Sequence, residues 1–219
     1  AHANIDGGTT ALNLATSSVG GNLTLTSGHY IIDSSTVTVG GNLVATTDAA
    51  NGVITMDGLR VDGTVQLTTH GSGDATVVND AGLTFLASTV RNLAATARSG
   101  NIVDSGVLTV AGTSSFTTSR NNANITLNNA NAFTGTVALN TTGSNGNATV
   151  VDASGLNLAA STVGGNLIAT ATTGDITDDG VLTVAGTSSF TTSANNADIT
   201  LNNVNALTGT VALNTSGST

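Results

Sequence analysis

The chain has 219 residues and a formal net charge of −9, only 8% of its residues are charged, and it contains no lysine, proline or cysteine. The charged fraction is far below the roughly 25% of an ordinary soluble domain. The acidic balance argues against nucleic acid and anionic membrane surfaces as partners. No apolar stretch approaches the ~18 residues of a bilayer span, so we expect no membrane insertion.

A long internal repeat organises the sequence. Residues 93–143 return as residues 167–217 with roughly four in five residues unchanged, and residues 108–116 return letter for letter as 182–190. Self-similarity at a fixed period is the signature of a stacked array. We therefore expect residues 1–219 to form one repetitive, elongated segment rather than several globular domains.

Shorter units follow one another along the chain. A Val-Gly-Gly-Asn-Leu corner begins at Val19, Val39 and Val163, and altered forms begin at Val61, Val90, Val110 and Val184. Alternating segments such as Leu23–Thr26 and Leu43–Thr46 follow the corners, and period two indicates strands with one buried face. Three short strands per unit of about 20–29 residues predict an all-β fold, a right-handed parallel β-helix of about nine coils.

Three coils make one super-repeat in this interpretation. The super-repeats cover approximately 19–89, 90–162 and 163–219 joined to 1–18, so the chain begins and ends part-way through a coil. Read across the join, residues 211–219 followed by 1–6 match the interior run 137–152. Uncapped coils expose bare strand edges. We therefore expect the partner to be the chain itself, stacked head to tail or side by side.

Stacking places equivalent residues in columns. A candidate binding face is an outward threonine column, and a turn ladder of Asp and Asn follows the second strand of each unit. Strand sterics and turn chemistry explain both columns most simply; a regular threonine column could instead bind ice or glycans. The threonine column contains Thr26, Thr46, Thr68, Thr96, Thr117, Thr170 and Thr191, and the ladder contains Asp33, Asp57, Asn79, Asp104, Asn128, Asp152, Asp178 and Asn202.

Patterns typical of catalysis or cofactor binding are weak. Calcium is the one cofactor considered, where Asp175, Asp178 and Asp179 cluster in sequence, but the calcium-binding nonapeptide does not recur. A polysaccharide-cleaving β-helix would need clustered carboxylates, and Asp62 and Asp74 near Arg60 are only loose candidates. We expect no cofactor and no enzymatic activity.

The Val-Gly-Gly-Asn-Leu corners, the repeated Leu-Thr-Val-Ala-Gly-Thr and the Thr/Asn-rich coils resemble the filamentous haemagglutinin-like exoproteins of bacteria. The resemblance covers the whole chain and is one of repeat style. It implies a long β-helical shaft that is secreted to the cell surface. The expected function is a structural or adhesive extracellular fibre, with cell-surface glycans as a further partner; the alternatives are an ice- or glycan-binding face and, more distantly, a polysaccharide-cleaving enzyme.

Overall fold

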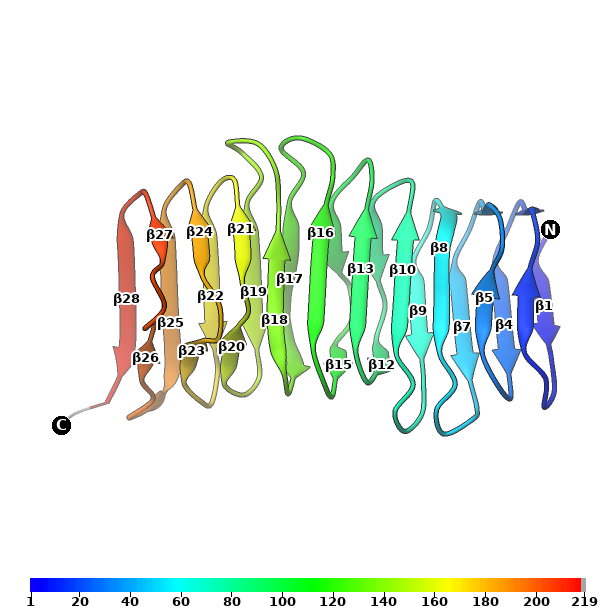
Figure 1. The fold of residues 1–219 in the computed structure, drawn as a ribbon, viewed down its shortest axis with the longest axis horizontal. Coiled ribbons are helices and arrows are strands. Elements are labelled where there is room, and N and C mark those ends of the chain that lie inside the picture. The colour runs from blue at the N-terminus through cyan, green and yellow to red at the C-terminus, as the bar shows by residue number, and fades with distance from the viewer. Residues whose placement is uncertain (218–219) are drawn as a thin grey trace.

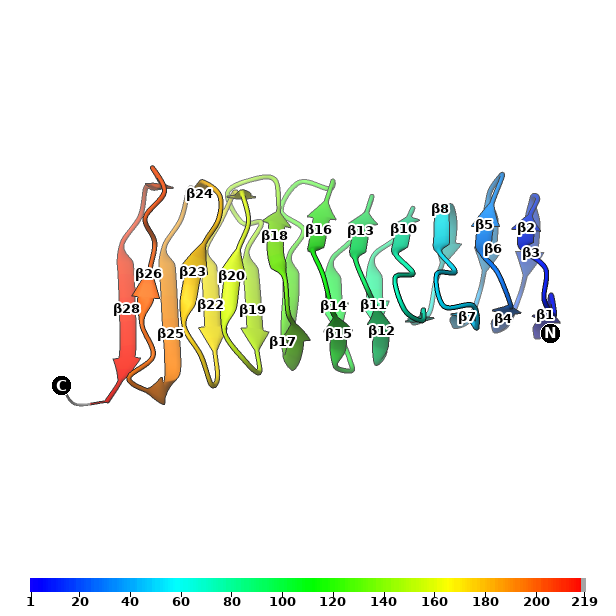
Figure 2. The same ribbon diagram turned by 60° about the horizontal axis from the view of Figure 1, so that its bottom comes forward.

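Two parallel β-sheets run side by side along the whole protein. The computed structural model describes residues 1–217, and its strands wind from one sheet to the other and back, with the termini at opposite ends of the resulting rod (Figure 1). Apart from the strands at the two ends of the rod, each strand pairs in parallel with strands one turn before and after it, as the view in Figure 2 also shows. The predicted all-β parallel solenoid is confirmed; its right-handed winding stays a prediction.

The first sheet, sheet A, contains thirteen strands. Most are single strands of four to six residues, and two turns contribute a bent pair instead. The strands are β1 (Ala3–Asp6), β4 (Leu23–Ser27), β7 (Leu43–Thr47), β9 (Val65–Thr68), β11 (Leu83–Phe85), β12 (Ser88–Val90), β14 (Ile102–Asp104), β15 (Leu108–Val110), β17 (Ile125–Phe133), β19 (Ala148–Asp152), β22 (Leu167–Ala171), β25 (Ser188–Asn195) and β28 (Val211–Ser216).

The second sheet, sheet B, contains fifteen strands. Bent pairs are more frequent here, at both ends of the rod. The strands are β2 (Leu12–Leu14), β3 (Ser17–Val19), β5 (Ile31–Asp33), β6 (Val37–Val39), β8 (Ile54–Val61), β10 (Ala75–Asn79), β13 (Leu93–Ala97), β16 (Ser114–Thr118), β18 (Thr136–Asn140), β20 (Leu156–Leu158), β21 (Ser161–Val163), β23 (Ile176–Asp178), β24 (Leu182–Val184), β26 (Ile199–Thr200) and β27 (Ala206–Leu207).

The core lies between the two sheets and follows from the period-two alternation. In β4, Leu23 and Leu25 are buried while Thr24 and Thr26 face outward. Leucine, isoleucine, valine and alanine fill most of the space, and all four phenylalanines are buried among them. The rings of Phe116 and Phe133 meet edge to face with centroids 5.9 Å apart. Each turn buries its apolar face against its own opposite strand and against the turns on either side.

Each turn of the solenoid is shorter than the sequence corners suggest. Ala75 pairs with Leu93 one turn further on, and Ile31 pairs in the same way with Ile54. One turn therefore covers the chain from Ala75 to Leu93 at one level and from Ile31 to Ile54 at another. The described chain therefore makes about ten turns, with eleven levels in sheet A and ten in sheet B. The expected nine coils correctly indicate a solenoid but undercount its turns.

The long repeat spans three and a half turns rather than the expected three. Leu93 begins β13 in sheet B, whereas its repeat equivalent Leu167 begins β22 in sheet A. Seven half-turns separate the two strands, and seven half-turns likewise separate β4 from β13. Because seven is odd, each repeat presents its equivalent residues on the opposite face from the repeat before it.

Between β4 and β13, the extra half-turn lies inside the longest predicted coil. The segment from Val61 to Thr89 contains β9 in sheet A, β10 in sheet B and most of the bent pair β11–β12 in sheet A again. The two half-turns have similar corners and similar alternation, so the sequence does not show which sheet a strand joins. The long coil is therefore one and a half turns.

Candidate functional site

The predicted threonine column is divided between the two sides of the rod. The half-turn offset places Thr26, Thr46 and Thr68 on sheet A, Thr96 and Thr117 on sheet B, and Thr170 and Thr191 on sheet A again. The register within each group is as predicted, since Thr26 pairs with Thr46 and Thr46 with Thr68. The seven residues do not form one continuous face.

Each side nevertheless has a longer threonine column than the sequence suggested. On sheet A, Thr68 pairs with Thr89 and Thr89 with Thr109, which gives five stacked threonines from Thr26 to Thr109. On sheet B the column continues from Thr117 through Asn140, Thr162 and Thr183. The missed threonines stand between two buried residues, as in Leu108-Thr-Val110 and Ser161-Thr-Val163, and that alternation identifies an outward strand position.

Both columns offer hydroxyl and methyl groups at the strand spacing of about 4.8 Å. The row beside the sheet A column is mixed, with Thr24, Val44 and Gln66 at successive levels. The surface can donate and accept hydrogen bonds, but its threonines contain no group that titrates near neutral pH. Such a row could recognise a hydroxyl-rich ligand or ordered water.

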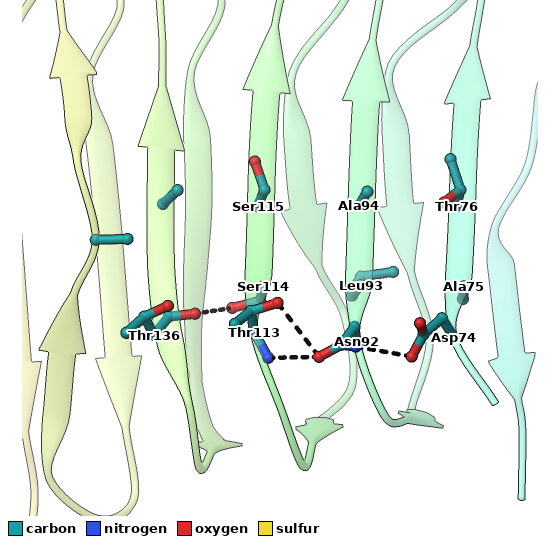
Figure 3. A pocket seen from close by; sticks show the side chains of 12 residues that line it. Asp74, Ala75, Thr76, Asn92, Leu93, Ala94, Thr113, Ser114, Ser115 and Thr136 are labelled. Carbon is teal, nitrogen blue, oxygen red and sulfur yellow. Dashed lines mark hydrogen bonds between the residues drawn. The ribbon is translucent and has the colours of Figure 1, made fainter. Parts of the chain in front are cut away.

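A shallow hollow of about 300 Å³ lies on sheet B, where the outward side chains are small (Figure 3). Thr76, Ala94 and Ser115 stand in a row on neighbouring strands, and Ala138 extends it. In the following repeat the residue equivalent to Ala94 is Ile168, which is exposed on sheet A. The hollow is therefore particular to one repeat.

The predicted Asp/Asn ladder supports bulges in the strands. The carboxylate of Asp104 accepts hydrogen bonds from the backbone N–H groups of Asn128 (2.9 Å) and Asn129 (3.1 Å), where β17 shifts register. Asp33 accepts those of Asp57 and Gly58 at 3.0 Å each. Bulged residues leave the strand ladder, so their N–H groups need another acceptor. The carboxylate of the turn below supplies it.

The ladder changes sides with the repeat, as the threonines do. Asp33, Asp57 and Asn79 belong to sheet B, Asp104, Asn128 and Asp152 to sheet A, and Asp178 and Asn202 to sheet B again. The acceptors Asn79, Asp104, Asp152 and Asp178 are buried, whereas Asp57, Asn128 and Asn202 are exposed and donate their backbone N–H groups. The residues act as turn supports, not as an open polar surface.

Two ladder carboxyls have altered acidity. Burial raises the pKa of Asp152 above its ordinary value, although N–H groups including those of Ser154 and Phe133 partly oppose this. Burial also raises the pKa of Asp33, against hydrogen bonds from Gly58 and Asp57. Asn79 occupies the position equivalent to Asp152 one repeat earlier, where its amide bonds both the N–H and the carbonyl of Val61. A neutral polar side chain can therefore make the hydrogen bonds at this ladder position.

A second polar ladder, not predicted from the sequence, follows the corner that leads into sheet A. The side-chain oxygen of each asparagine accepts the backbone N–H of the residue one turn further on, at 2.8–2.9 Å. The available signal was the asparagine of the Val-Gly-Gly-Asn-Leu corner. The ladder runs through Asn101, Asn124, Asn147, Asn166 and Thr187.

The acids considered for calcium have separate partners. Asp175 accepts the backbone N–H of Asp198, Asp178 supports the β26–β27 bulge, and Asp179 accepts the side chain of Asn157. Within residues 1–217, no group of three or more acids and histidines could hold a metal ion. The loose catalytic candidates are not brought together either, because Asp74 faces Arg91 at 3.7 Å and bonds Asn92.

The fold and its columns define a tandem-repeat parallel β-solenoid. The chain belongs to the family described as Repeats of unknown function (DUF5649), which it matches over residues 2–68, 72–140 and 145–214. These three units begin just before β1, β10 and β19 and have the period of the predicted super-repeats, cut at a different point. Neither the curated proteins nor the solved structures gave a match. The part of the chain that the structure describes has no helix suited to crossing a membrane.

Proposed function

We propose that this protein is a structural shaft, a fibre segment whose length is set by the number of repeats. The observation that supports this best is the continuity of the strand ladders across the borders of the family units. β8 pairs with β10 across the first border, and β17 pairs with β19 across the second. A unit that joins its neighbour without a linker extends the rod by a fixed amount.

The proposed location is the cell surface or the surrounding medium. The resemblance to filamentous haemagglutinin-like exoproteins supports this placement, as does a composition that obtains its polarity from Thr, Ser and Asn with few charges. Low charge permits rods to lie close together, because little repulsion opposes lateral contact. The proposal assigns no reaction to the chain; adhesion would come from the side faces.

Electron microscopy with antibody labelling tests the shaft proposal. Intact cells should bind an antibody against the repeat, and labelled material should consist of rods with an axial spacing of about 4.8 Å. Permeabilised cells give the total amount of protein, so the two signals can be compared. Labelling that appears only after permeabilisation would overturn the surface location, and labelled particles without the axial spacing would overturn the shaft.

Glycan binding along sheet A is a second candidate, favoured by the column of five stacked threonines. Thr89 and Thr109 are its exposed members. Replacing both with tyrosine should abolish retention on immobilised cell-surface glycans and leave the fold intact, while Thr162→Tyr on sheet B is the matched control. Equal retention of all three proteins would dismiss the candidate.

A further inference from the structure

The last layer of the rod nearly duplicates an interior layer. Residues 199–214 form β26, β27 and the start of β28, and their equivalents 125–140 form β17 and the whole of β18. Fourteen of the sixteen residues are identical, the exceptions being Ala130 against Val204 and Phe133 against Leu207. The interior layer therefore shows what this sequence packs against when it is covered.

The interior layer is covered by the beginning of the next family unit. Ile125 and Thr126 of β17 pair with Ala148 and Thr149 of β19. On the other sheet, Val137 pairs with Leu158 and Asn140 with Thr162. These pairs bury Val137 and Leu139 completely.

The same positions are open at the end of the rod. Val211 is 44% exposed and Leu213 is 59% exposed, whereas their equivalents Val137 and Leu139 are both at 0%. The opposite end also exposes an apolar side chain that is buried in the interior. Ile5 in β1 is 40% exposed, whereas its equivalent Val150 is at 0%. Both open surfaces combine apolar side chains with a bare strand edge, which favours pairing with another strand.

We propose that the edge formed by β26, β27 and β28 pairs with the β1–β3 edge of a second copy of this chain, in the register of the interior layer. This inference rests on the proposed shaft function and specifies how shafts join. The partners across the junction follow by equivalence. Ile199, Thr200 and Leu201 face Ala3, Asn4 and Ile5 of the second copy, and Thr210, Val211 and Asn214 face Asn13, Leu14 and Ser18 of the second copy.

Polar groups at the junction match as well. In the interior, the side chain of Asn124 accepts the backbone N–H of Asn147 at 2.8 Å. Asp198 is equivalent to Asn124, is exposed, and presents a carboxylate at the same corner. It can accept the backbone N–H of His2 of the second copy and continue the corner ladder. A further repeat in a longer polypeptide would use the same register.

The junction also fixes the rotation between copies. The described chain contains 21 half-turns, eleven in sheet A and ten in sheet B. An odd number requires sheet A of the second copy to continue sheet B of the first. The five-threonine column therefore changes sides at every junction, so an assembled rod presents it alternately on opposite faces.

Engineered disulfides test the register directly, because the chain has no cysteine of its own. Ser18→Cys combined with Asn214→Cys places two thiols on outward positions predicted to be direct neighbours across the junction. Neighbouring strands lie about 4.8 Å apart, within the Cα distance that a disulfide spans. Mild oxidation should give a ladder of covalent oligomers. The two positions lie at opposite ends of one rod, so a bond within a copy is impossible.

The matched control combines Asn214→Cys with Asn13→Cys. Asn13 lies on the same end but is predicted to face Thr210 rather than Asn214, so this pair should cross-link much less. Circular dichroism confirms that both variants are folded. Equal cross-linking of the two pairs, stronger cross-linking of the control pair, or no oligomers from either pair would overturn the register.

A charge at the open edge provides an independent measurement. Leu213→Asp should shorten rods seen by electron microscopy to single copies of about 50 Å, the height of 21 half-turns, while Thr89→Asp on the side face should leave their lengths unchanged. Rods of unaltered length in Leu213→Asp would overturn the end-to-end junction. That result would leave the shaft proposal standing, because the axial spacing of native fibres tests the shaft separately.

Discussion

Residues 125–140 and 199–214 are nearly the same sequence in two different situations. In the middle of the rod this sequence has a turn above and below it, and Leu139 is fully buried; at the end one neighbour is missing, and Leu213 is 59% exposed. The comparison teaches that burial in a solenoid is supplied mainly by the neighbouring turn. The same leucine can be core or surface, depending only on its level.

The largest expected difference comes from removing that leucine at each level. Leu139→Ala should lower the free energy of unfolding by about 2–5 kcal/mol, because it opens a cavity in a closed core. Leu213→Ala should cost less than about 1 kcal/mol in an isolated rod, since much of its side chain is already exposed. Chemical denaturation of both variants measures the difference. Equal losses would mean that the end is covered in solution.

A buried threonine at equivalent positions in the middle and near the end of the rod should show a smaller difference in stability of the same kind. Thr118 is buried and donates its hydroxyl to the carbonyl of Ala123 at 3.2 Å, and Thr192 does the same with Ala197 near the end of the rod. Thr118→Val keeps the shape but leaves that carbonyl without its partner, so we expect a loss of about 1–3 kcal/mol.

Thr192→Val should open its own turn without destabilising the middle, and hydrogen exchange can resolve the two regions. Thr117→Val, at the neighbouring outward position, is the control and should change stability by no more than about 0.5 kcal/mol. Protection factors that fall equally along the whole rod in Thr192→Val would show that the end does not unfold locally.

The sequence predicted the strands, the inward residues and the period, because alternation and turn residues determine these locally. It did not predict the number of turns. Leu93 and Leu167 have similar neighbours in sequence, and nothing local distinguishes a strand of sheet A from one of sheet B. Only the count of half-turns between them does, and the segment 135–162, which holds β18, β19 and the pair β20–β21, conceals one.

The candidate site was predictable to the same extent. The alternation identified Thr26, Thr46 and Thr68 as outward neighbours, and they are. The alternation could not assign Thr89 to the same column. Thr89 lies in β12, the second strand of the bent pair β11–β12, so its distance from a glycine corner differs from that of the other members. The Asp/Asn ladder was predicted at the turn after the second strand of each unit. Most of its members lie within strands or at their ends, and their role in bulges depends on registers that the sequence does not show.

A carboxyl and an amide at equivalent positions sharpen the comparison between repeats. Because burial raises the pKa of Asp152, its favourable contribution is fully present below the unfolded-state pKa of about 3.9 and is lost as the pH rises through the folded value. Asp152→Asn can adopt the hydrogen bonds that Asn79 makes. It should therefore raise the free energy of unfolding at pH 7 by about 1 kcal/mol and leave it nearly unchanged at pH 3.

The measurement is a series of denaturation curves across this pH range. Asn79→Asp is the reciprocal variant and should lose stability at pH 7 but not at pH 3. Asp33 is present in both variants. Because its pKa is also raised, it still makes the free energy of unfolding fall as the pH rises. An Asp152→Asn variant that loses stability at pH 7 but not at pH 3 would show that the carboxylate is a required acceptor.

Salt should have the smallest effect, and it separates hydrogen-bonded ladders from ion pairs as the source of stability. Residues 1–217 contain two ion pairs, Arg98 with Asp80 at 2.7 Å and Arg91 with Asp74 at 3.7 Å, and all four side chains are about half exposed. Exposed pairs contribute at most about 1 kcal/mol each and are screened by salt.

Both pairs lie in the middle turns, so salt should not reduce the difference in stability between the middle and the end of the rod. We expect the melting temperature to change by less than about 3 °C between dilute buffer and molar salt, and a large fall would mean that charge, rather than the neighbouring turn, holds the middle of the rod together.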